Sequence, residues 1–497
     1  MEPHSNIGHK RGKHIVFLCV RLCFYVPMWF KNLLRSEIRK LTVKLYLLIL
    51  TGTLFTAEAQ IPLLKISSNK RFFQTADGKP FFWLGDTGWL LFAKCDRADA
   101  VKYLDTRKQQ GFNVVQVMVL HDVNIKNAYG DYALKNADVS MPDVTPGNNF
   151  NDTVAYDYWD HAEFIIDEAG KRGIYVALVA VWGSNVKSGK VNLRNAESYA
   201  RFLAERFRTR NNIIWVDGGD IPGNEGMEVW KKIATTIKKY DNRHLMTFHP
   251  RGRYSSSDWF HHEPWLDFNM IQSGHKDYSQ DTSSKELHHY GEDNWKFIGA
   301  DYKMKPVKPT LDGEPSYENI PHGLHDSLQK RWTDADVRRY AYWSVFAGAA
   351  GFTYGENAIM QFYTKGSGGG SFGVNQNWKE TIHATGAQQM QYVKKLMLGR
   401  SYFDRVPDQG LLIDNGERYD HILATRGKNY AMFYSYNSKP FKVAINKLNF
   451  FPGRGIWFKP SDGQTINISE YRNSTTATFD PPGETMDGND WVLILER

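Results

Sequence analysis

Between residues 60 and 400, eight apolar runs rich in β-branched and aromatic residues alternate with segments of helical pattern. The runs are PFFWLGDTGW (80–89), NVVQVMVLH (113–121), IYVALVAVW (174–182), NIIWVDGGD (212–220), HLMTFHP (244–250), LDFNMIQSGH (266–275), KPTLDGEPS (308–316) and GFTYGE (351–356). The helical segments are 96–110, 155–171, 195–209, 225–240, 285–297 and 334–348. Strands that are apolar throughout and are separated by helices predict a parallel sheet buried on both faces.

Eight such units favour an α/β fold of the (β/α)8 TIM-barrel type, with loop insertions. A doubly wound open sheet is the alternative, but no Gly-rich phosphate-binding motif follows the first run, and this argues against that fold. We therefore expect a TIM barrel over 60–402. The segment GSGGGS (366–371) is expected to be a flexible loop close to the end of the barrel.

The pattern changes after about residue 403, where short β-like runs are separated by Gly, Asn, Asp and Pro. GLLIDN, YAMFYSY and DWVLILER are examples of these runs. Such a pattern predicts a smaller antiparallel β-sandwich over 403–497.

Residues 1–59 have the features of a leader or signal peptide. KLYLLILTGTLF combines a basic flank with an apolar core, and Ala57 and Ala59 are small residues at the −3 and −1 positions before Gln60. A second apolar stretch further upstream indicates that the true start is Met28. We expect a periplasmic or secreted bacterial protein, cleaved near Gln60 and without a stable membrane anchor. An uncleaved N-terminal anchor is the alternative.

The basic charge of the chain is concentrated in the leader. Nine Lys or Arg and three Asp or Glu in residues 1–59 account for +6 of the formal net charge of +8, so the remainder is nearly neutral. A nearly neutral chain argues against a nucleic-acid partner. Aromatic residues make up 14% of the sequence, which suits stacking against sugar rings.

Many of the apolar runs end in polar or aromatic residues. These residues are Asp86, Trp89, His121, Asp122, Trp182, Asp217, Asp220, His249, Gln272, His275, Glu314, Tyr354 and Glu356. The C-terminal strand ends of a TIM barrel meet on the face that holds the active site. A single histidine at a strand end is more often structural, but the whole set predicts a catalytic cleft.

Two carboxylate positions carry a specific chemistry. WVDGGD ends the fourth run and LDGE ends the seventh, so Asp220 and Glu314 should face each other across the barrel mouth. Glycoside hydrolysis uses such a pair, one carboxyl group as the proton donor and the other as the nucleophile in retaining enzymes. Asp217 competes with Asp220, although residues three apart on a regular strand face opposite ways.

The arrangement resembles the clan of barrel glycosidases with the acid/base on strand four and the nucleophile on strand seven. In those relatives strand four reads roughly Trp-x-x-x-Asn-Glu, whereas here Trp215 leads to Gly219 and Asp220. FFWLGDTGWLLF, GFNVVQVMVL, IIWVDGGD and LDGEPSYENIP are more specifically similar to the apiosidase-like family, glycoside hydrolase family 140. The tail resembles the collagen-binding-type β-domain that accompanies this family.

The resemblance implies a retaining glycosidase that cleaves apiosyl linkages in the side chains of the pectin rhamnogalacturonan II. Glu314 would be the nucleophile and Asp220 the acid/base, with Asp217 in reserve. The residues expected to bind the plant cell-wall substrate are Asp86, Trp89, His121, Trp182, His249, Gln272, His275, Tyr317 and Tyr354.

Other readings stay open. The enzyme could act on another pentose or a deoxysugar, or the chain could be a non-catalytic carbohydrate-binding or adhesion protein. Neither a cofactor nor a metal is expected, because the two carboxyl groups supply the chemistry and the adjacent His261 and His262 lack the HExxH spacing.

Overall fold

The computed structural model describes residues 61–152, 154–281, 290–468 and 475–497, and the predicted leader lies outside these ranges. Residues 61–497 belong to one compact unit. No helix in the described ranges is both long enough and apolar enough to cross a bilayer.

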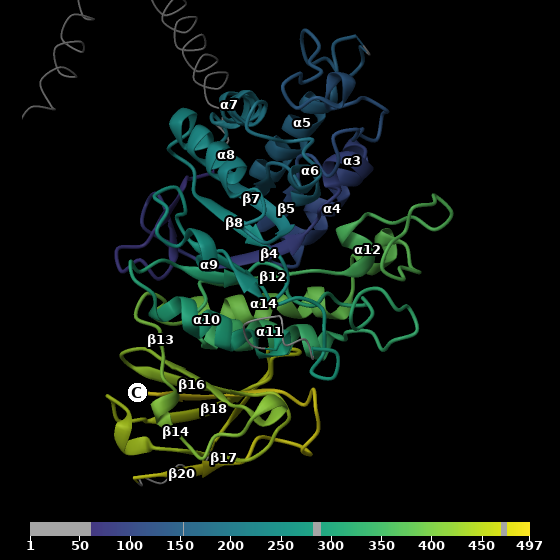
Figure 1. Ribbon diagram of the computed structural model, residues 1–497. Helices are drawn as coiled ribbons and strands as arrows, with labels where there is room; N and C mark the ends of the chain where they lie inside the picture. Colours follow the sequence, from purple (N-terminus) through teal and green to yellow (C-terminus); the bar gives the residue numbers. More distant parts are fainter. Residues whose placement is uncertain (1–60, 153, 282–289, 469–474) are drawn as a thin grey trace, which may run out of the picture. The chain divides into compact units, whose positions relative to one another are not determined.

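Eight parallel strands form the centre of the chain, and each corresponds to one of the eight predicted runs (Figure 1). They are β4 (Trp83–Thr87), β5 (Val114–Met118), β6 (Tyr175–Val179), β7 (Ile213–Ile221), β8 (Met246–Pro250), β10 (Asn269–Gln272), β11 (Thr310–Asp312) and β12 (Gly351–Tyr354). The sheet runs in the order β8-β7-β6-β5-β4-β12-β11-β10, and the short β9 (Tyr254–Ser255) pairs antiparallel with β10.

Backbone contact between β8 and the segment before β10 closes the barrel. The Asp267 amide donates to the Met246 carbonyl at 2.9 Å, and the Asp267 carboxylate accepts from the Met246 amide at 2.7 Å. Inward-facing residues such as Ile214 and Val216 pack in the barrel interior, whereas Ile213 and Trp215 pack against the helices. The TIM-barrel prediction is confirmed, and the open-sheet alternative is excluded by this closure.

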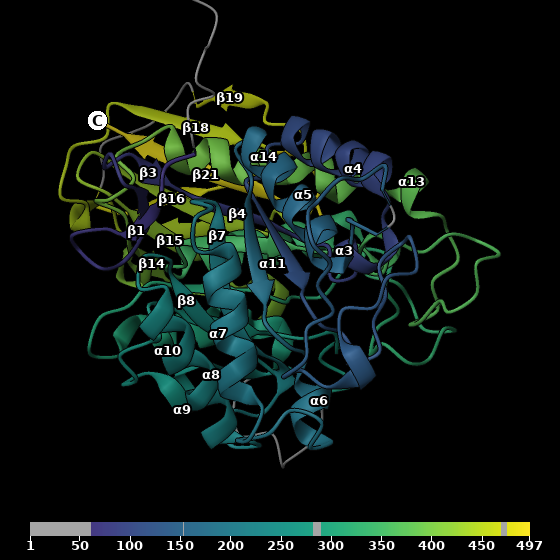
Figure 2. The same ribbon diagram turned by 90° about the horizontal axis from the view of Figure 1, so that it is seen from above.

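Helices lie outside the strands (Figure 2). The longer ones are α4 (Arg97–Gln109), α5 (Tyr158–Lys171), α7 (Ala196–Phe207), α8 (Met227–Tyr240), α10 (Asn294–Lys303), α11 (Asp334–Phe346) and α14 (Thr385–Leu398). The shorter ones are α3 (Leu91–Lys94), α6 (Gly183–Lys187), α9 (Ser257–Phe260), α12 (Asn357–Met360) and α13 (Trp378–Thr381). Short 3-10 turns occupy Lys135–Ala137, Gly291–Asp293, Gln409–Leu411, Arg418–Asp420 and Ile445–Lys447.

Side-chain caps explain where several of these helices begin. Asp96 caps α4 by accepting from the Asp99 amide, and capping boxes start α5 at Asp157 and α11 at Thr333. The helix predicted at 285–297 begins later, at Asn294, because a 3-10 turn precedes it. Part of that predicted range lies outside the described residues.

A small antiparallel sheet precedes the barrel, with strands β1 (Leu64–Ile66), β2 (Phe73–Thr75) and β3 (Pro80–Phe81). The Phe73 ring packs edge-on against Phe268, with ring centroids 5.0 Å apart, and also contacts Trp83 at the start of β4. This sheet therefore covers the end of the barrel where the strands begin, opposite the catalytic end.

The C-terminal part contains two antiparallel sheets, of six and three strands, with an apolar core of its own. The sheets are ordered β13-β15-β16-β21-β18-β19 and β14-β17-β20. Their strands are β13 (Val406–Pro407), β14 (Leu412–Ile413), β15 (Leu423–Arg426), β16 (Tyr430–Ser435), β17 (Phe441–Val443), β18 (Arg454–Phe458), β19 (Thr465–Asn467), β20 (Ala477–Phe479) and β21 (Trp491–Glu496). This matches the predicted sandwich, which we call the β-domain.

Buried polar contacts join the β-domain to α11. Arg338 on α11 forms an ion pair with Asp490 at 2.9 Å, and the rings of Tyr342 and Tyr434 stack with centroids 4.8 Å apart.

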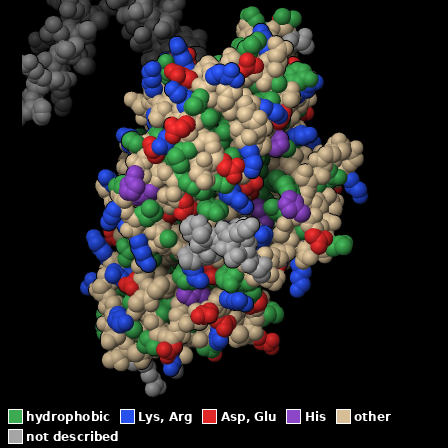
Figure 3. Space-filling view, viewed as in Figure 1, with side chains coloured by type: hydrophobic (Ala, Val, Ile, Leu, Met, Phe, Trp, Pro, Cys, Tyr) green, Lys and Arg blue, Asp and Glu red, His purple; other side chains and the backbone are tan. Residues whose placement is uncertain are grey.

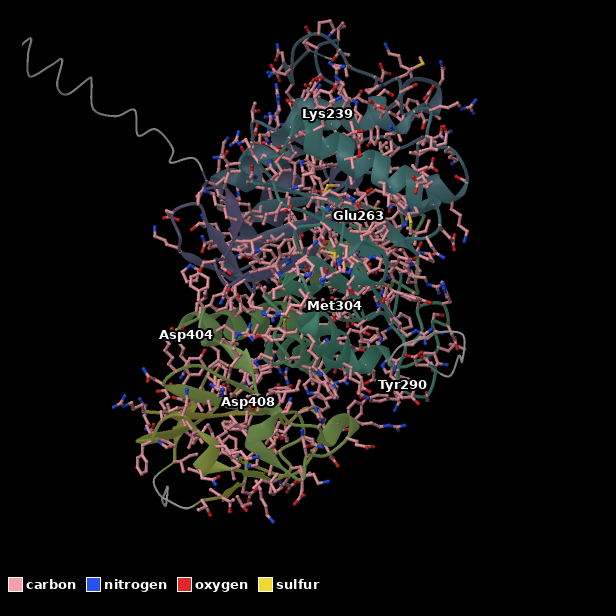
Figure 4. The ribbon with its side chains drawn as sticks, turned by 60° about the vertical axis from the view of Figure 1, so that its left-hand side comes forward. Lys239, Glu263, Tyr290, Met304, Asp404 and Asp408 are labelled. Carbon is pink, nitrogen blue, oxygen red and sulfur yellow. The ribbon has the colours of Figure 1, made fainter. Side chains whose placement is uncertain are left out.

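Figure 4 labels Asp404 and Asp408 where the chain passes from α14 into the β-domain. Figure 3 shows acidic and basic side chains interspersed over the face in view.

Candidate active site

A cavity of about 430 Å³ opens where the barrel strands end, and its volume suits a small ligand. Most of its lining comes from strand ends and from the loops that follow them. The lining residues are Trp89, Leu90, Lys94, Met118, His121, Ile125, Trp182, Asp220, Gln272, His275, Glu314, Tyr317, Ile320, Leu324, Met360, Gln361, Gly369, Ser371 and Phe372. Asp220 and Glu314 thus share one cavity.

Glu314 follows β11 directly and has a main chain that is fixed on both sides. The Gly313 amide donates to the Ile271 carbonyl, and the Gln116 side chain donates to the Gly313 carbonyl, both at 2.8 Å. A Cβ at position 313 would lie 2.5 Å from the sulfur of Met270, so a larger residue there would require the Met270 side chain to move. The chain therefore brings Glu314 to the cavity floor, where it is 7% exposed.

Two histidines face the Glu314 carboxylate. His249 Nε2 lies 3.0 Å from Oε2, and His275 Nε2 lies 3.2 Å from Oε1. Burial alone would raise the pKa of Glu314, but these two imidazoles outweigh it and lower the pKa to about 2. Glu314 is therefore an ionised carboxylate near neutral pH.

Asp220 reaches the cavity through an irregularity in β7. Gly218, Gly219 and Asp220 have φ angles of 84°, 113° and 50°, and the pairing with β8 shifts between Gly218 and Ile221. Positive φ is natural for glycine and strained for aspartate. Asp220 has the same parity as Ile214 and Val216, which face the barrel interior, and the bulge lies directly before it at the cavity.

The surroundings of Asp220 favour its protonated form. The side chain is exposed to the cavity, but the cavity walls limit its contact with water and the negative charge of Glu314 lies nearby. Burial first and the Glu314 charge second raise its pKa to about 6. The two carboxyl groups therefore have pKa values displaced in opposite directions, which is the relation expected of an acid and a nucleophile.

His249 contacts both Asp220 and Glu314. Its Nδ1 accepts from the Asp220 amide at 3.4 Å, and its Nε2 lies 3.0 Å from Glu314 Oε2. The rings of Trp89 and Trp182 pack on His249 with centroids 5.4 and 5.7 Å away. The indoles hold the imidazole in this orientation.

Asp217 does not line the cavity. Its side chain is buried, and its Oδ1 accepts from the Gly218 amide at 3.1 Å. It has the same parity on β7 as Ile213 and Trp215, which face the helices. Burial raises the pKa of Asp217 well above its ordinary value, which favours the protonated form of this side chain.

Of the nine residues predicted to bind substrate, six line the cavity: Trp89, His121, Trp182, Gln272, His275 and Tyr317. His249 lies behind the cavity wall, in contact with Glu314. Asp86 is fully buried in an ion pair with Arg107 at 2.7 Å, which fastens α4 to β4. Tyr354 is also fully buried and donates to Glu318 at 2.5 Å. Asp86 and Tyr354 thus have structural contacts and do not reach the cavity.

Several lining residues were not predicted, because they lie in loops and short helices and not at strand ends. Lys94 ends α3, and Gln361, Ser371 and Phe372 belong to the long excursion between β12 and α14. Gln361 exchanges two hydrogen bonds with Ser371, at 2.8 and 3.1 Å, which fastens that excursion at its base. The GSGGGS segment, predicted as a flexible loop, contributes Gly369 and Ser371 to the cavity wall.

The described ranges contain no group of His, Cys, Asp and Glu side chains that could hold a metal ion. His261 is bonded to the Asn269 side chain and the Pro306 carbonyl, at 3.3 and 3.0 Å. These two hydrogen-bond partners are typical of a histidine with a structural role.

The barrel and its facing carboxyl groups define a glycoside hydrolase, and comparison with known proteins agrees. The chain belongs to the apiosidase-like family, whose catalytic-domain model matches residues 67–404. A second model, "Putative collagen-binding domain of a collagenase", matches residues 406–496.

Two solved structures are similar over nearly their whole length. One, described as "Glycoside hydrolase", is 44% identical with a TM-score of 0.82, and the match covers 88% of this chain and 97% of that one. The other, described as a glycoside hydrolase family 5 protein from Bacteroides vulgatus ATCC 8482, is 42% identical with a TM-score of 0.82 and covers 88% and 94%. The curated proteins contain no match to this chain.

Proposed function

We propose that this protein is a retaining glycosidase that cleaves apiosyl linkages in rhamnogalacturonan II side chains of plant pectin. The family supports the sugar, and the opposed pKa values of Asp220 and Glu314 are the observation that supports the roles. No cofactor enters the proposal, because two carboxyl groups suffice for the reaction.

In the first step the ionised Glu314 attacks the anomeric carbon while the protonated Asp220 donates its proton to the leaving oxygen. The C–O bond to the leaving sugar breaks, and a glycosyl ester to Glu314 forms. Asp220, now a carboxylate, then takes a proton from water. That water attacks the same carbon, releases Glu314 and gives a product of retained configuration.

His249 and His275 keep Glu314 ionised in the cavity, and their two Nε2 atoms hold its oxygens in place. Once Glu314 forms the ester, its charge near Asp220 disappears. The pKa of Asp220 then falls, so the same group becomes a better base for the second step.

Product analysis on rhamnogalacturonan II oligosaccharides tests the substrate. We expect release of a fragment with apiose at its new reducing end, with retained configuration by NMR at early times. Release of a different sugar would assign the same chemistry to another pentose or deoxysugar. Binding without any product would favour a carbohydrate-binding protein and overturn the proposal.

We also propose that the protein is exported and that its mature chain begins near Gln60. The basic flank, the apolar core and the small residues before Gln60 support this placement. N-terminal sequencing of the mature protein is the test, and retention of residues 28–50 would contradict it.

A further inference from the structure

The imidazole of His275 depends on its main chain for its orientation. Its Nε2 lies 3.2 Å from Glu314 Oε1, but its Nδ1 is buried and has no hydrogen-bond partner among the described residues. The ring packs edge-on against Tyr317, with centroids 4.7 Å apart. His249, by contrast, accepts a hydrogen bond at its second nitrogen. The main chain around residue 275 therefore decides whether this imidazole meets Glu314.

Two sets of contacts hold this main chain. At the first, the His275 carbonyl accepts from the Gly323 amide at 2.7 Å. At the second, three residues further on, the Tyr278 amide donates to Glu292 Oε1 at 3.0 Å, and the Tyr278 hydroxyl donates to Asp293 at 2.7 Å. The second set belongs to the 3-10 turn that precedes α10, so the position of this turn bears on the position of His275.

Glu292 lies close to the end of β10. The preceding residue, Gly291, packs so closely on Ser273 that a Cβ at position 291 would lie 2.2 Å from the Ser273 carbonyl oxygen. Glu292 itself is fully buried, and a buried carboxylate is costly without charge and hydrogen-bond partners. Arg339 on α11, which is also fully buried, is one such partner, because its Nη1 donates to Glu292 Oε2 at 2.7 Å.

The β-domain supplies the other partner of this carboxylate. The Tyr419 hydroxyl donates to Glu292 Oε2 at 2.7 Å. The Tyr419 ring lies 4.6 Å from the Arg339 guanidinium and 5.5 Å from the Tyr278 ring, and the Arg418 guanidinium lies 5.0 Å from the Tyr278 ring. The β-domain turn that carries Tyr419 thus contacts both Glu292 and the loop that Glu292 holds.

We propose that the β-domain completes the active site, because Tyr419 positions Glu292 and Glu292 positions the main chain that carries His275. Neither Tyr419 nor Glu292 lines the cavity, so both are positioning residues that act on the reaction through the imidazole. The inference rests on the proposed function for the role of Glu314 as the nucleophile. It gives the β-domain a part in catalysis although every reacting group lies in the barrel.

Kinetics of Y419F in the full chain tests the proposal. The substrate is an aryl apioside with an activated leaving group, because its cleavage depends on the nucleophile and little on proton donation. We expect kcat/KM to fall about 2- to 10-fold, the range that corresponds to one hydrogen bond. Y436F is the matched control and should behave as wild type. The Tyr436 ring also packs on Arg339, at 5.1 Å, but its hydroxyl donates to Asp336 at 3.3 Å.

A double-mutant cycle asks whether the effect passes through His275. In an H275N background, Y419F should cause no further loss, because the imidazole that Tyr419 positions is absent. Losses that multiply in the double variant would show that Tyr419 acts by another route and would overturn the proposal. An unchanged kcat/KM in Y419F, or equal losses in Y419F and Y436F, would also overturn it.

A measurement without substrate separates this inference from the proposed function. In protein with ¹⁵N-labelled histidine, the imidazole NMR signals of His275 are assigned by their loss in H275N. Y419F should shift these signals and leave those of the buried His161 unchanged, whereas Y436F should shift neither. If the enzyme cleaves no apiosyl compound but this shift is present, the proposed substrate fails and the role of Tyr419 stands. If the His275 signals do not move, the role of Tyr419 fails whatever the enzyme cleaves.

Discussion

The ends of β7 and β11 each present one carboxyl group to the cavity, and their backbones are built in opposite ways. β11 is short and regular, and hydrogen bonds fix the main chain just before Glu314. β7 is long and ends in a glycine bulge that leaves Asp220 at positive φ. One end gives a buried carboxylate held by two imidazoles, and the other gives an acid at the cavity surface.

This difference teaches that residue type does not set the chemical role. Both groups are carboxylic acids with similar ordinary pKa values, yet their surroundings move the two values to about 6 and about 2. The two histidines stabilise the negative charge of Glu314. At Asp220, burial and the neighbouring charge of Glu314 disfavour ionisation. Variants that alter either end should separate these effects.

The largest effect is expected from removing the nucleophile. E314Q keeps the shape of the side chain but cannot form the glycosyl ester, so kcat should fall by about 10⁴-fold or more. Steady-state kinetics and mass spectrometry for the covalent intermediate would measure this. An E314Q enzyme with substantial activity would place the nucleophile elsewhere.

A smaller loss is expected from D220N, because proton donation typically contributes about 10²–10⁴-fold. The loss should be least on substrates with an activated leaving group, which needs no protonation. Azide should partly restore turnover of such a substrate and give a glycosyl azide of retained configuration. An azide product of inverted configuration would contradict the covalent mechanism.

The bulge itself is the next target. A Cβ in G219A would lie 2.5 Å from the Trp182 ring, and φ at this position is 113°. An alanine at this φ is expected to strain the backbone by about 1–3 kcal/mol. If the backbone relieves this strain by shifting, Asp220 is displaced, and kcat should fall about 10-fold or more. G299A on α10 is the control, because a Cβ there meets nothing within 4 Å. Equal effects of the two substitutions would argue against a catalytic role for the bulge.

The pH profile of kcat/KM reports on both ends at once. The proposed roles require ionised Glu314 and protonated Asp220, so activity should rise through about pH 2 and fall through about pH 6. H275N removes one stabilising imidazole, so the pKa of Glu314 should rise and the acid limb should move towards neutral pH. H383N, an exposed histidine outside the cavity, is the matched control. An acid limb unchanged in H275N would contradict this role of His275.

The smallest effect is expected from D217N. Burial raises the pKa of Asp217 and so favours its uncharged form, and asparagine has nearly the same shape and no charge. Activity and thermal stability should stay close to wild type. A loss comparable to that of D220N, with azide rescue, would exchange the roles of the two aspartates.

Much of this architecture could be predicted from the sequence, because strand and helix periods are local properties. The eight runs ending at residues such as Asp220 and Glu314 are continuous and apolar, and the structure has a barrel strand in each. The alternation rule also indicated that Asp217 and Asp220 face opposite ways. It could not give the direction of the bulge, which depends on three successive positive φ angles.

The remaining differences arise from contacts between distant parts of the chain. Asp86 stands at a strand end like the other candidates, but Arg107 on α4 neutralises it in the interior. Nothing in the local pattern around Lys94 or Phe372 indicates that the loops fold over the cavity. The position of the loops depends on hydrogen bonds such as those between the Gln361 side chain and the Ser371 backbone.

The excursion between β12 and α14 has a further consequence for how such an enzyme diversifies. Its base is fastened by Gln361, while added Cβ atoms at Gly366, Gly368 and Gly369 would meet nothing within 4 Å. These glycines have φ angles of 88°, 72° and 71°, which other residues adopt only with strain, so the tip has room for insertions that leave the three glycines in place. Grafting tips of different length onto this base is a route to new substrate ranges in which the catalytic pair is inherited unchanged.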